Sequence, residues 1–577
     1  MTILNNASLI ALAQLNFCAG DFEYNSKKII KSINEAKKNG VKLLLFPQMS
    51  IEGADISTVF ERHPRLLNDN KKWLNGIANF VDNLTVIVGF VDINNGELLN
   101  SLAIISDGTV KKIIFNNGTS QIYEIDNVKY LFVFDECLEN IQEDFDVILS
   151  FESFVSRTNS EFYRNQKLSK FAKKYSKPLV NVNRVGAVDG LSFDGISRVY
   201  NSKGDIIARA KAFEEELYFF NSRENNNIEK MPFGLENKPK ESFSINYEDD
   251  LERTYLSLVQ ITRDYFTKNG FERAVLGLSG GLDSTVSAVI LVDALGKENV
   301  YCISMPSKIT SSESRSDAEQ LAFNLGMHFS EVSIKTIYEE YSNIFSHMFG
   351  EIQQKWDCRY SKSFTNDNIQ ARARAMYLWG VSNEFAKCTP IATSDKSESY
   401  MGYATINGDM SGGFAPLADI TKTKLFALAR WLNKNRTEQN AIPESIILKR
   451  PGAELAIDEK TGKPLCAEDA LMPYEFMDEV IWRIENKGES YQEMLSSKFV
   501  YEENNDLSLD DKKAWLDKFF RRMSTSAYKW SILPPSAIID TYSISKNEYN
   551  LPISSAGVNY KTIELQEIIN ILNTVNL

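Results

Sequence analysis

Residues 274–296 read AVLGLSGGLDSTVSAVILVDALG and decide the fold of the second half of the chain. The apolar run before Ser279 predicts a buried strand, and the apolar residues from Leu282 onward predict a helix. Glycines in the turn between them let the backbone approach a ligand closely. The free N–H groups and partial positive charge at the start of a helix favour phosphate. The stretch therefore predicts a phosphate-binding loop at the end of a strand.

The length of this motif separates it from an ordinary turn. SGG alone would equally fit a strand-to-helix turn in which Asp283 is only a helix-start carboxylate. SGGLDST directly after a strand is more specific and favours phosphate binding. The Walker pattern GxxxxGK[ST] is absent, so transfer of a γ-phosphate is not the expected reaction.

The loop resembles the pyrophosphate-binding loop of the N-type ATP pyrophosphatases, which cleave ATP between the α and β phosphates and adenylate a substrate oxygen. Downstream blocks are similar to ENxQARxR, TTGNKSE, GYxTxxGD and GGFAPxxDxxKT of the NAD synthetase family. The matching stretches are SMPSKITSSES (304–314), NIQARARAMYLWGVSNE (368–384), PIATSDKSES to LARWLN (390–433) and KRPGAEL (449–455). The resemblance covers most of residues 248–485 and implies an ATP-dependent amide ligase that converts deamido-NAD, ATP and ammonia to NAD, AMP and pyrophosphate.

The resemblance implies a role for each matched residue on the ATP side. The pyrophosphate of ATP would be held by Ser279, Gly280, Gly281, Asp283, Ser284 and Thr285. Further contacts to ATP are expected from Thr393 and Lys422. The catalytic residues would be Asp283, Lys396 and Lys422. Asp283 and Glu398 are expected to bind Mg²⁺, because this ion on a polyphosphate takes carboxylate oxygens.

On the acceptor side the resemblance implies a second set of residues, which are Asn368, Arg372, Arg374, Asp409 and Lys529. A planar guanidinium suits bidentate binding of a phosphate or carboxylate. By itself, the pair Arg372 and Arg374 would equally fit a solvated helix face.

Several departures from the family pattern leave the ATP chemistry more secure than the identity of the acceptor. Ile406 and Asn407 stand where the family often has a Lys, and Gly452 replaces a Ser or Thr. TGNKSE has become TSDKSE, and the YKRRQ-PP block is reduced to YKWSILPP (528–535). Two alternatives therefore stay open: the same chemistry on another nicotinate-like carboxylic acid, or a non-catalytic dinucleotide-binding scaffold. The carboxylates Asp283 and Glu398 argue against the scaffold.

The first 220 residues alternate short apolar runs with helical patterns and predict an α/β sandwich. This half resembles the nitrilase-type glutaminase domain of glutamine-dependent NAD synthetases. FPQMSIEG (46–53) is similar to FPELSLTG, and residues 181–217 are similar to the end of that domain. The predicted fold class is thus α/β, a nitrilase-like sandwich followed by a Rossmann-like N-type ATP pyrophosphatase domain with a parallel sheet.

The resemblance implies a catalytic Glu, Lys and Cys, but this chain has other residues in those columns. Gln48 replaces the base, Asn116 falls where the Lys is expected, and Phe134 occupies the column of the Cys. We therefore predict a degenerate glutaminase domain without activity of its own. The alternative is an active domain with a shifted triad, in which Cys137, three residues later, would be the nucleophile.

The length of 577 residues predicts more than one domain. We expect a nitrilase-like domain at 1–221, a linker at 222–247 and a synthetase-like domain with a C-terminal extension at 248–577. The net charge of -13 argues against nucleic-acid binding, and three histidines make histidine catalysis an unfavoured mechanism. No signal or membrane-spanning stretch is recognisable, and six scattered cysteines suit a reducing cytoplasm. We expect a cytoplasmic homodimer or higher homo-oligomer that takes ammonia from solution or a separate source.

Overall fold

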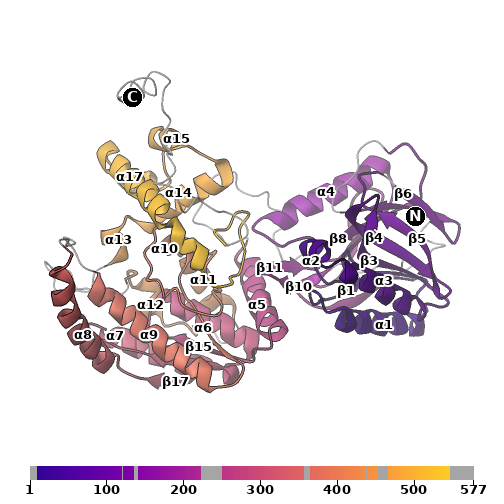
Figure 1. Ribbon diagram of the computed structural model, residues 1–577. Coiled ribbons are helices and arrows are strands. Elements are labelled where there is room, and N and C mark those ends of the chain that lie inside the picture. Colours follow the sequence, from indigo (N-terminus) through magenta and orange to yellow (C-terminus); the bar gives the residue numbers. More distant parts are fainter. Residues whose placement is uncertain are drawn as a thin grey trace, which may run out of the picture. The chain divides into compact units, whose positions relative to one another are not determined.

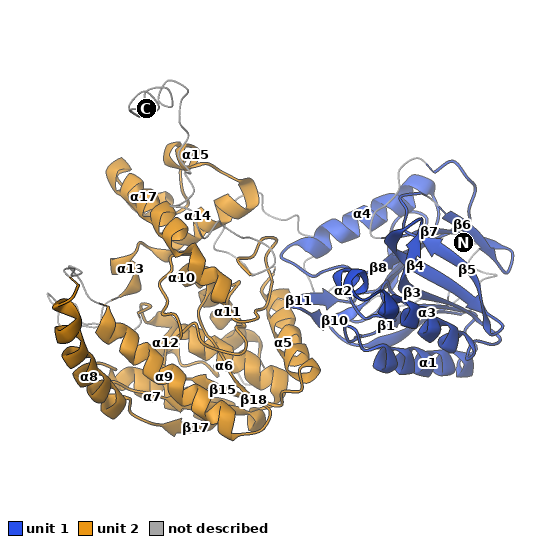
Figure 2. Ribbon diagram, viewed as in Figure 1, with its two compact units in different colours: residues 1–239 blue, residues 240–577 orange. Residues whose placement is uncertain are grey.

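The computed structural model describes residues 9–119, 121–134, 141–221, 250–356, 364–436, 440–452 and 466–545. The chain forms two compact units, residues 1–239 and 240–577 (Figure 2). The predicted linker at 222–247 lies outside the described residues. Within the described ranges, no helix is long and apolar enough to cross a membrane.

Two six-stranded sheets form the centre of the N-terminal unit (Figure 1). The first has the order β14 (Glu216–Phe220), β1 (Ile10–Gln14), β2 (Leu43–Leu45), β3 (Thr85–Asn94), β4 (Glu97–Ser106), β5 (Thr109–Phe115). The second has the order β13 (Ile206–Arg209), β12 (Arg198–Tyr200), β9 (Leu179–Asn183), β8 (Val147–Glu152), β7 (Val128–Val133), β6 (Gln121–Ile125). The remaining elements are the ribbon β10 (Val185–Val188) and β11 (Leu191–Asp194) and the helices α1 (Phe22–Lys38), α2 (Ser57–Arg62), α3 (Pro64–Ala78) and α4 (Ser160–Tyr175).

The layers of this unit follow from its core clusters. Leu12 and Leu45 of the first sheet meet Phe132 and Leu149 of the second sheet in one buried cluster. A second cluster joins the outer face of the first sheet to α1 and α3, and a third joins the second sheet to α4. The order is helix, sheet, sheet, helix, the predicted α/β sandwich.

Helix α1 illustrates why the sequence folds in this way. Ile29 and Ile33 are four residues apart, so they lie on one face, and both are fully buried against the first sheet. Such burial stabilises the fold by roughly 2 kcal/mol for each side chain. Asp21 caps the helix by accepting the N–H of Tyr24 at 3.0 Å, and Gly40 follows the helix at a φ of +70°.

A parallel four-stranded sheet forms the centre of the C-terminal unit. Its order is β17 (His328–Glu331), β16 (Val300–Ser304), β15 (Arg273–Gly277), β18 (Cys388–Pro390). The longer helices are α5 (Leu251–Lys268), α6 (Leu282–Leu295), α7 (Ser312–Leu325), α8 (Lys335–Gln353), α9 (Thr365–Glu384), α11 (Lys422–Asn435), α14 (Tyr474–Lys487) and α17 (Leu509–Ser526). The short ones are α10 (Lys396–Tyr400), α12 (Glu444–Leu448), α13 (Ala467–Ala470), α15 (Tyr491–Ser496), α16 (Tyr501–Asn504) and the 3-10 turns Lys297–Asn299 and Ala527–Ile532.

The helices of this unit hold the carboxyl edge of the sheet in place. Helix α6 contacts β15 and β16 and packs against α5 and α11, while α9 contacts β15 and β18 (Figure 1). A second core of mostly aromatic and Met side chains joins α10 to α14, α15 and α17. Because all four strands are parallel, their carboxyl ends meet at one edge, which is where ligands bind in open α/β sheets.

Candidate active site

The predicted phosphate loop connects β15 to α6 and has the backbone that such a loop needs. Gly280 has a φ of +76°, and a Cβ there would lie 2.1 Å from the carbonyl oxygen of Ser314, so only glycine fits. Gly281 is the N-cap of α6 and has no side chain to cap the helix. Within the turn, the N–H of Gly281 donates to Ser279 Oγ at 3.2 Å, and Ser284 Oγ donates to the carbonyl of Gly281 at 3.2 Å.

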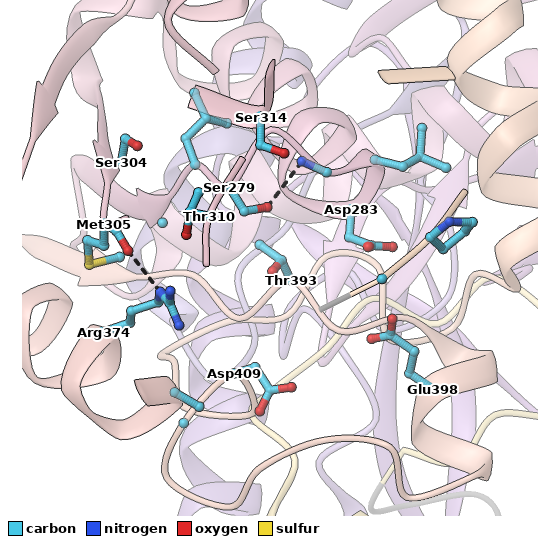
Figure 3. Close-up of a pocket in the computed structure, with 18 of the residues that line it drawn as sticks. Ser279, Asp283, Ser304, Met305, Thr310, Ser314, Arg374, Thr393, Glu398 and Asp409 are labelled. Atoms are coloured by element: carbon cyan, nitrogen blue, oxygen red, sulfur yellow. Dashed lines mark hydrogen bonds between the residues drawn. The ribbon is translucent and has the colours of Figure 1, made fainter. Parts of the chain in front are cut away.

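A pocket of about 260 Å³ opens next to this loop, at the carboxyl ends of β15, β16 and β18 (Figure 3). The residues predicted from the sequence that line it are Ser279, Gly281, Asp283, Arg374, Thr393, Glu398, Asp409 and Lys422. The pocket walls do not include the predicted residues Gly280, Ser284, Thr285, Asn368, Arg372, Lys396 and Lys529. The structure thus brings residues from five separated segments of the chain to one cavity.

Lys422 lies at the centre of an ionic cluster in this pocket. Its Nζ is 2.6 Å from Asp283 Oδ1, 2.7 Å from Asp395 Oδ2 and 3.1 Å from Glu398 Oε1. The backbone N–H of Lys422 donates to Ser397 Oγ at 2.9 Å, which joins the start of α11 to α10. Sequence reasoning predicted Asp283 and Glu398 as acidic ligands but missed Asp395. Its position in the altered TSDKSE block was the available signal.

The three carboxylates could hold a divalent cation. One ligand oxygen from each of Asp283, Asp395 and Glu398 lies within 4.8 Å of the others. Oxygen atoms of this kind are the ligands that Mg²⁺ takes in proteins. The donor set therefore fits the predicted cation, with Lys422 as a competing positive charge.

Burial controls the electrostatics of the cluster. Burial raises the pKa of Asp395 to about 7, against the opposing effect of Lys422. Burial also raises the pKa of Glu398 well above its usual range. For Lys422, burial favours the neutral form, but Asp283, Asp395 and Glu398 outweigh it, so its pKa lies well above the ordinary value. Lys422 is therefore a charged ammonium in a site of excess negative charge.

Lys396, predicted from the sequence as a catalytic residue, does not line this pocket. Its Nζ is fully buried and lies 2.7 Å from Glu485, 3.1 Å from Asp419 and 3.4 Å from Asp540. It also donates to the carbonyl of Tyr542 at 2.9 Å. Lys396 follows Asp395 directly on a helix, so the two side chains leave α10 in different directions. Its role in the structure is to tie α10 to α14 and to the segment around residue 540.

The residues predicted for the acceptor divide into two groups. Arg374 and Asp409 line the pocket, and Arg374 Nε donates to the carbonyl of Met305 at 3.1 Å (Figure 3). Asn368 lies behind the wall, where its Oδ1 accepts from Thr405 Oγ1 at 2.8 Å. The N–H of Thr405 in turn donates to Asp409 Oδ1 at 2.5 Å, and burial raises the pKa of Asp409.

Arg372 and Lys529 likewise brace the segment that carries Asp409. Arg372 Nε donates to the carbonyl of Ile406 at 3.2 Å. Lys529 Nζ donates to the carbonyls of Gly402 at 2.8 Å and Ala404 at 2.6 Å, and burial lowers its pKa. Both cations therefore support the pocket wall from outside the cavity. Gly452 lines the pocket, but the next residues of the predicted RPGAEL block, 453–455, lie outside the described part.

The N-terminal unit brings the three altered glutaminase positions to the same ends of its two sheets. Gln48 is 1% exposed, and its Nε2 donates to the carbonyl of Phe151 at 2.6 Å. Asn100 Nδ2 donates to Gln48 Oε1 at 3.0 Å. The N–H of Asn116 donates to the carbonyl of Asn100 at 2.9 Å. Asn116, which directly follows β5, therefore lies beside Asn100 of β4. Gln48 is thus held on both sides of its amide.

Phe134 follows β7 and is buried in the core between the two sheets, in the same cluster as Phe132 and Phe151. Cys137, the alternative nucleophile, lies outside the described residues. Lys111 and Lys112 of β5 precede Asn116, the position where the family has its catalytic Lys. Both are exposed, so their side chains do not enter the buried core.

Comparisons with known proteins agree with this architecture. Residues 254–510 match the NAD synthase family, and residues 9–117 match the carbon-nitrogen hydrolase family. The glutamine-dependent NAD(+) synthetase of Aquifex aeolicus is 34% identical over 523 residues, 82% of this chain and 88% of that protein. The enzyme of the same name from Thermotoga maritima is 32% identical over 540 residues, 85% of this chain and 91% of that protein.

Solved structures give the same result for the fold. The structure of glutamine-dependent NAD+ synthetase from Acinetobacter baumannii in complex with ADP has a TM-score of 0.68 at 28% identity, over 95% of this chain and 98% of that one. The Cytophaga hutchinsonii enzyme, at 20% identity, has a TM-score of 0.78 over 95% and 98% of the two chains and is similar in fold. The predicted fold class and the prediction of a carbon–nitrogen ligase are confirmed. From the identity and coverage of these relatives, the chain belongs to the glutamine-dependent NAD(+) synthetase family.

Proposed function

We propose that the C-terminal unit converts deamido-NAD to NAD at the expense of ATP. The nicotinate carboxylate attacks the α-phosphate of ATP and releases pyrophosphate, and ammonia then displaces AMP from the acyl-adenylate. The observation that carries this proposal is the union, in one pocket, of the SGG loop at the start of α6 with Asp283, Glu398 and Lys422. A phosphate-binding turn and a strongly charged cluster at a parallel sheet edge suit charge stabilisation on a leaving pyrophosphate.

Each group has a definite task in this mechanism. The N–H groups at the start of α6 and the hydroxyl of Ser279 hold the phosphates. Lys422 compensates the negative charge that grows on the leaving pyrophosphate. A Mg²⁺ ion held by Asp283 and Glu398 would neutralise part of the same charge when it is bound. Arg374 and Asp409 also line the pocket and are the proposed contacts of the acceptor.

We infer further that ammonia does not come from glutamine hydrolysed by the N-terminal unit. Hydrolysis needs a nucleophile and a base, but Phe134 has no nucleophilic atom, and Gln48 cannot accept a proton as a carboxylate does. The buried bond from Gln48 Nε2 to Phe151 supports this inference, because it uses an N–H that a catalytic carboxylate would not have. The relatives are named glutamine-dependent, so this would be a departure within the family.

The assay follows label and product together. The purified full chain is supplied with ATP, Mg²⁺ and deamido-NAD, with either ammonium or amide-15N glutamine, and AMP and NAD are measured by mass spectrometry. We expect NAD formation with ammonium and no labelled NAD with glutamine. Related nicotinate-like acids, tested in parallel, identify the acceptor. Labelled NAD from glutamine, lost on Cys137→Ala, would establish a shifted triad. Absence of AMP release with every acid would refute the ligase assignment.

We propose that the chain works as a homodimer or higher homo-oligomer. Helix α8 buries none of its side chains, and it exposes Ile344, Met348 and Phe349. The adjoining α9 exposes Met376 and Trp379. Exposed apolar side chains on two helices that contact each other favour association with a second copy. Sedimentation at micromolar concentration should give a dimer or larger species, and Ile344→Lys should dissociate it, with Lys335→Glu as a polar control on the same helix. A fully active wild-type monomer would refute the proposal.

A further inference from the structure

Asp395 differs from the other carboxylates of the Lys422 cluster because it is completely enclosed. Its side chain is 0% exposed, whereas those of Asp283 and Glu398 are 26% and 19% exposed. Asp283 and Glu398 line the pocket, and Asp395 does not. A ligand that enters the cavity therefore meets two of the three carboxylates, while the third lies behind them.

Both oxygens of Asp395 already have a structural task. Oδ1 accepts the N–H of Glu398 at 2.8 Å and so caps the start of α10. Oδ2 lies 2.7 Å from Lys422 Nζ, and the lysine side chain is itself only 1% exposed. The cap fixes the position of the carboxylate, and the carboxylate then fixes the ammonium.

The way in which Lys422 pairs with the carboxylates decides how much negative charge is left for a divalent cation. When all three carboxylates are ionised, they and the one ammonium together carry two negative charges. If Asp395 is counted with Lys422 as a neutral pair, these two charges belong to Asp283 and Glu398, which face the pocket. Without the Asp395 charge, Lys422 would have only those two carboxylates as partners and would compete directly with an entering cation.

We propose that Asp395 is a positioning residue that serves as the permanent counter-ion of Lys422 and so leaves Asp283 and Glu398 available to a divalent cation. This rests on the proposed cation site at Asp283 and Glu398. The ammonium of Lys422 still lines the pocket proposed for the nucleotide, and with the three carboxylates ionised the cluster carries a net charge that matches one divalent ion.

The test measures cation binding without nucleotide or turnover. Mn²⁺, as the probe in place of Mg²⁺, is titrated into the full chain, and free ion is followed by electron paramagnetic resonance. Asp395→Asn should retain the helix cap, because its amide oxygen can accept the same N–H. We expect the Mn²⁺ affinity of Asp395→Asn to fall by about tenfold or more, because Lys422 then pairs with the pocket-facing carboxylates.

A double variant separates pairing from direct ligation. If Lys422 and Asp395 form a neutral pair, removing both in Lys422→Met with Asp395→Asn should restore Mn²⁺ affinity to within about threefold of wild type. If Asp395 were itself a ligand of the ion, the double variant would stay weak, and the proposal would be wrong. Asp540→Asn is the matched control, because that carboxylate pairs with Lys396 on the far side of α10. Its affinity should equal that of wild type.

The outcomes also distinguish this inference from the proposed function. Equal Mn²⁺ affinity in wild type and Asp395→Asn would overturn the role of Asp395 and leave the cation site intact. Wild-type binding that survives Asp283→Asn unchanged would overturn the cation site itself, and the inference with it. Thermal unfolding of every variant, followed by circular dichroism, shows whether each one is folded when its affinity is measured.

Discussion

Replacing the buried Gln48 amide by a carboxylate tests most directly whether Gln48 is a buried hydrogen-bond donor in the N-terminal unit. In Gln48→Glu the new group would be 1% exposed, opposite the Phe151 carbonyl that now accepts from Nε2 at 2.6 Å. An ionised Glu cannot donate, so two acceptor oxygens would face each other. A protonated Glu can donate its O–H to the same carbonyl and resembles the native amide.

The cost should therefore depend on pH, with a definite sign. Burial raises the pKa of the introduced carboxyl above its unfolded value of about 4.3, so the native state binds the extra proton. Stability is then lost as the pH rises through this window. A buried carboxylate without its donor costs about 3 kcal/mol, whereas the protonated form costs less than about 1 kcal/mol. We expect these two losses near pH 8 and pH 5, respectively.

Native-state hydrogen exchange on the full chain measures this loss locally. Peptides from β2 and β8 report the free energy of opening of the N-terminal unit. Gln166→Glu, an exposed position on α4, is the control and should change stability by less than about 0.5 kcal/mol. Equal losses at both pH values would refute the buried-acceptor argument. Transfer of 15N from glutamine to NAD by Gln48→Glu alone would refute the inference that the N-terminal unit lacks a nucleophile for glutamine hydrolysis, since this change restores only the base.

Three further predictions concern other ionisable side chains. Asp283→Asn should lower the rate of ATP-dependent AMP release by roughly 10²-fold. The control is Asp205→Asn, on the exposed turn between β12 and β13. A near-normal rate in Asp283→Asn would show that Asp283 has no part in the mechanism. Glu52 is fully buried, and burial raises its pKa to about 8. The native state therefore loses stability as the pH rises from the pKa of Glu52 in the unfolded chain to that value. Glu52→Gln should thus stabilise the chain at pH 7 by up to roughly 3 kcal/mol in urea unfolding, with no gain below about pH 4; a constant gain would contradict this. Lys396→Met leaves Glu485 and its two neighbouring carboxylates without their cation and should lower the free energy of unfolding by about 3–5 kcal/mol. The control Lys434→Met, on the exposed surface of α11, should lower it little. Equal melting temperatures of the two variants would contradict the network.

Short-range features of this chain could be predicted from the sequence because they depend on neighbouring residues. The stretch SGGLDST specifies the turn from strand to helix: Gly280 adopts a positive φ, and Asp283 lies in the first turn of α6. The alternation of apolar runs with helical patterns likewise predicts two α/β units. The altered residues Gln48, Asn116 and Phe134 were recognisable because their neighbours still match the family pattern.

What only the tertiary structure decided is which charges meet. Lys396 and Lys422 both lie in matched blocks, and nothing local distinguishes them. Successive residues on α10 point in different directions, so Asp395 reaches Lys422 while Lys396 reaches Glu485, 89 residues away. The partners of Gln48 come from β4 and β8, at sequence separations of 52 and 103 residues. Such contacts follow from the packing of whole sheets and helices, because a side chain's partner is set by the elements that pack beside it.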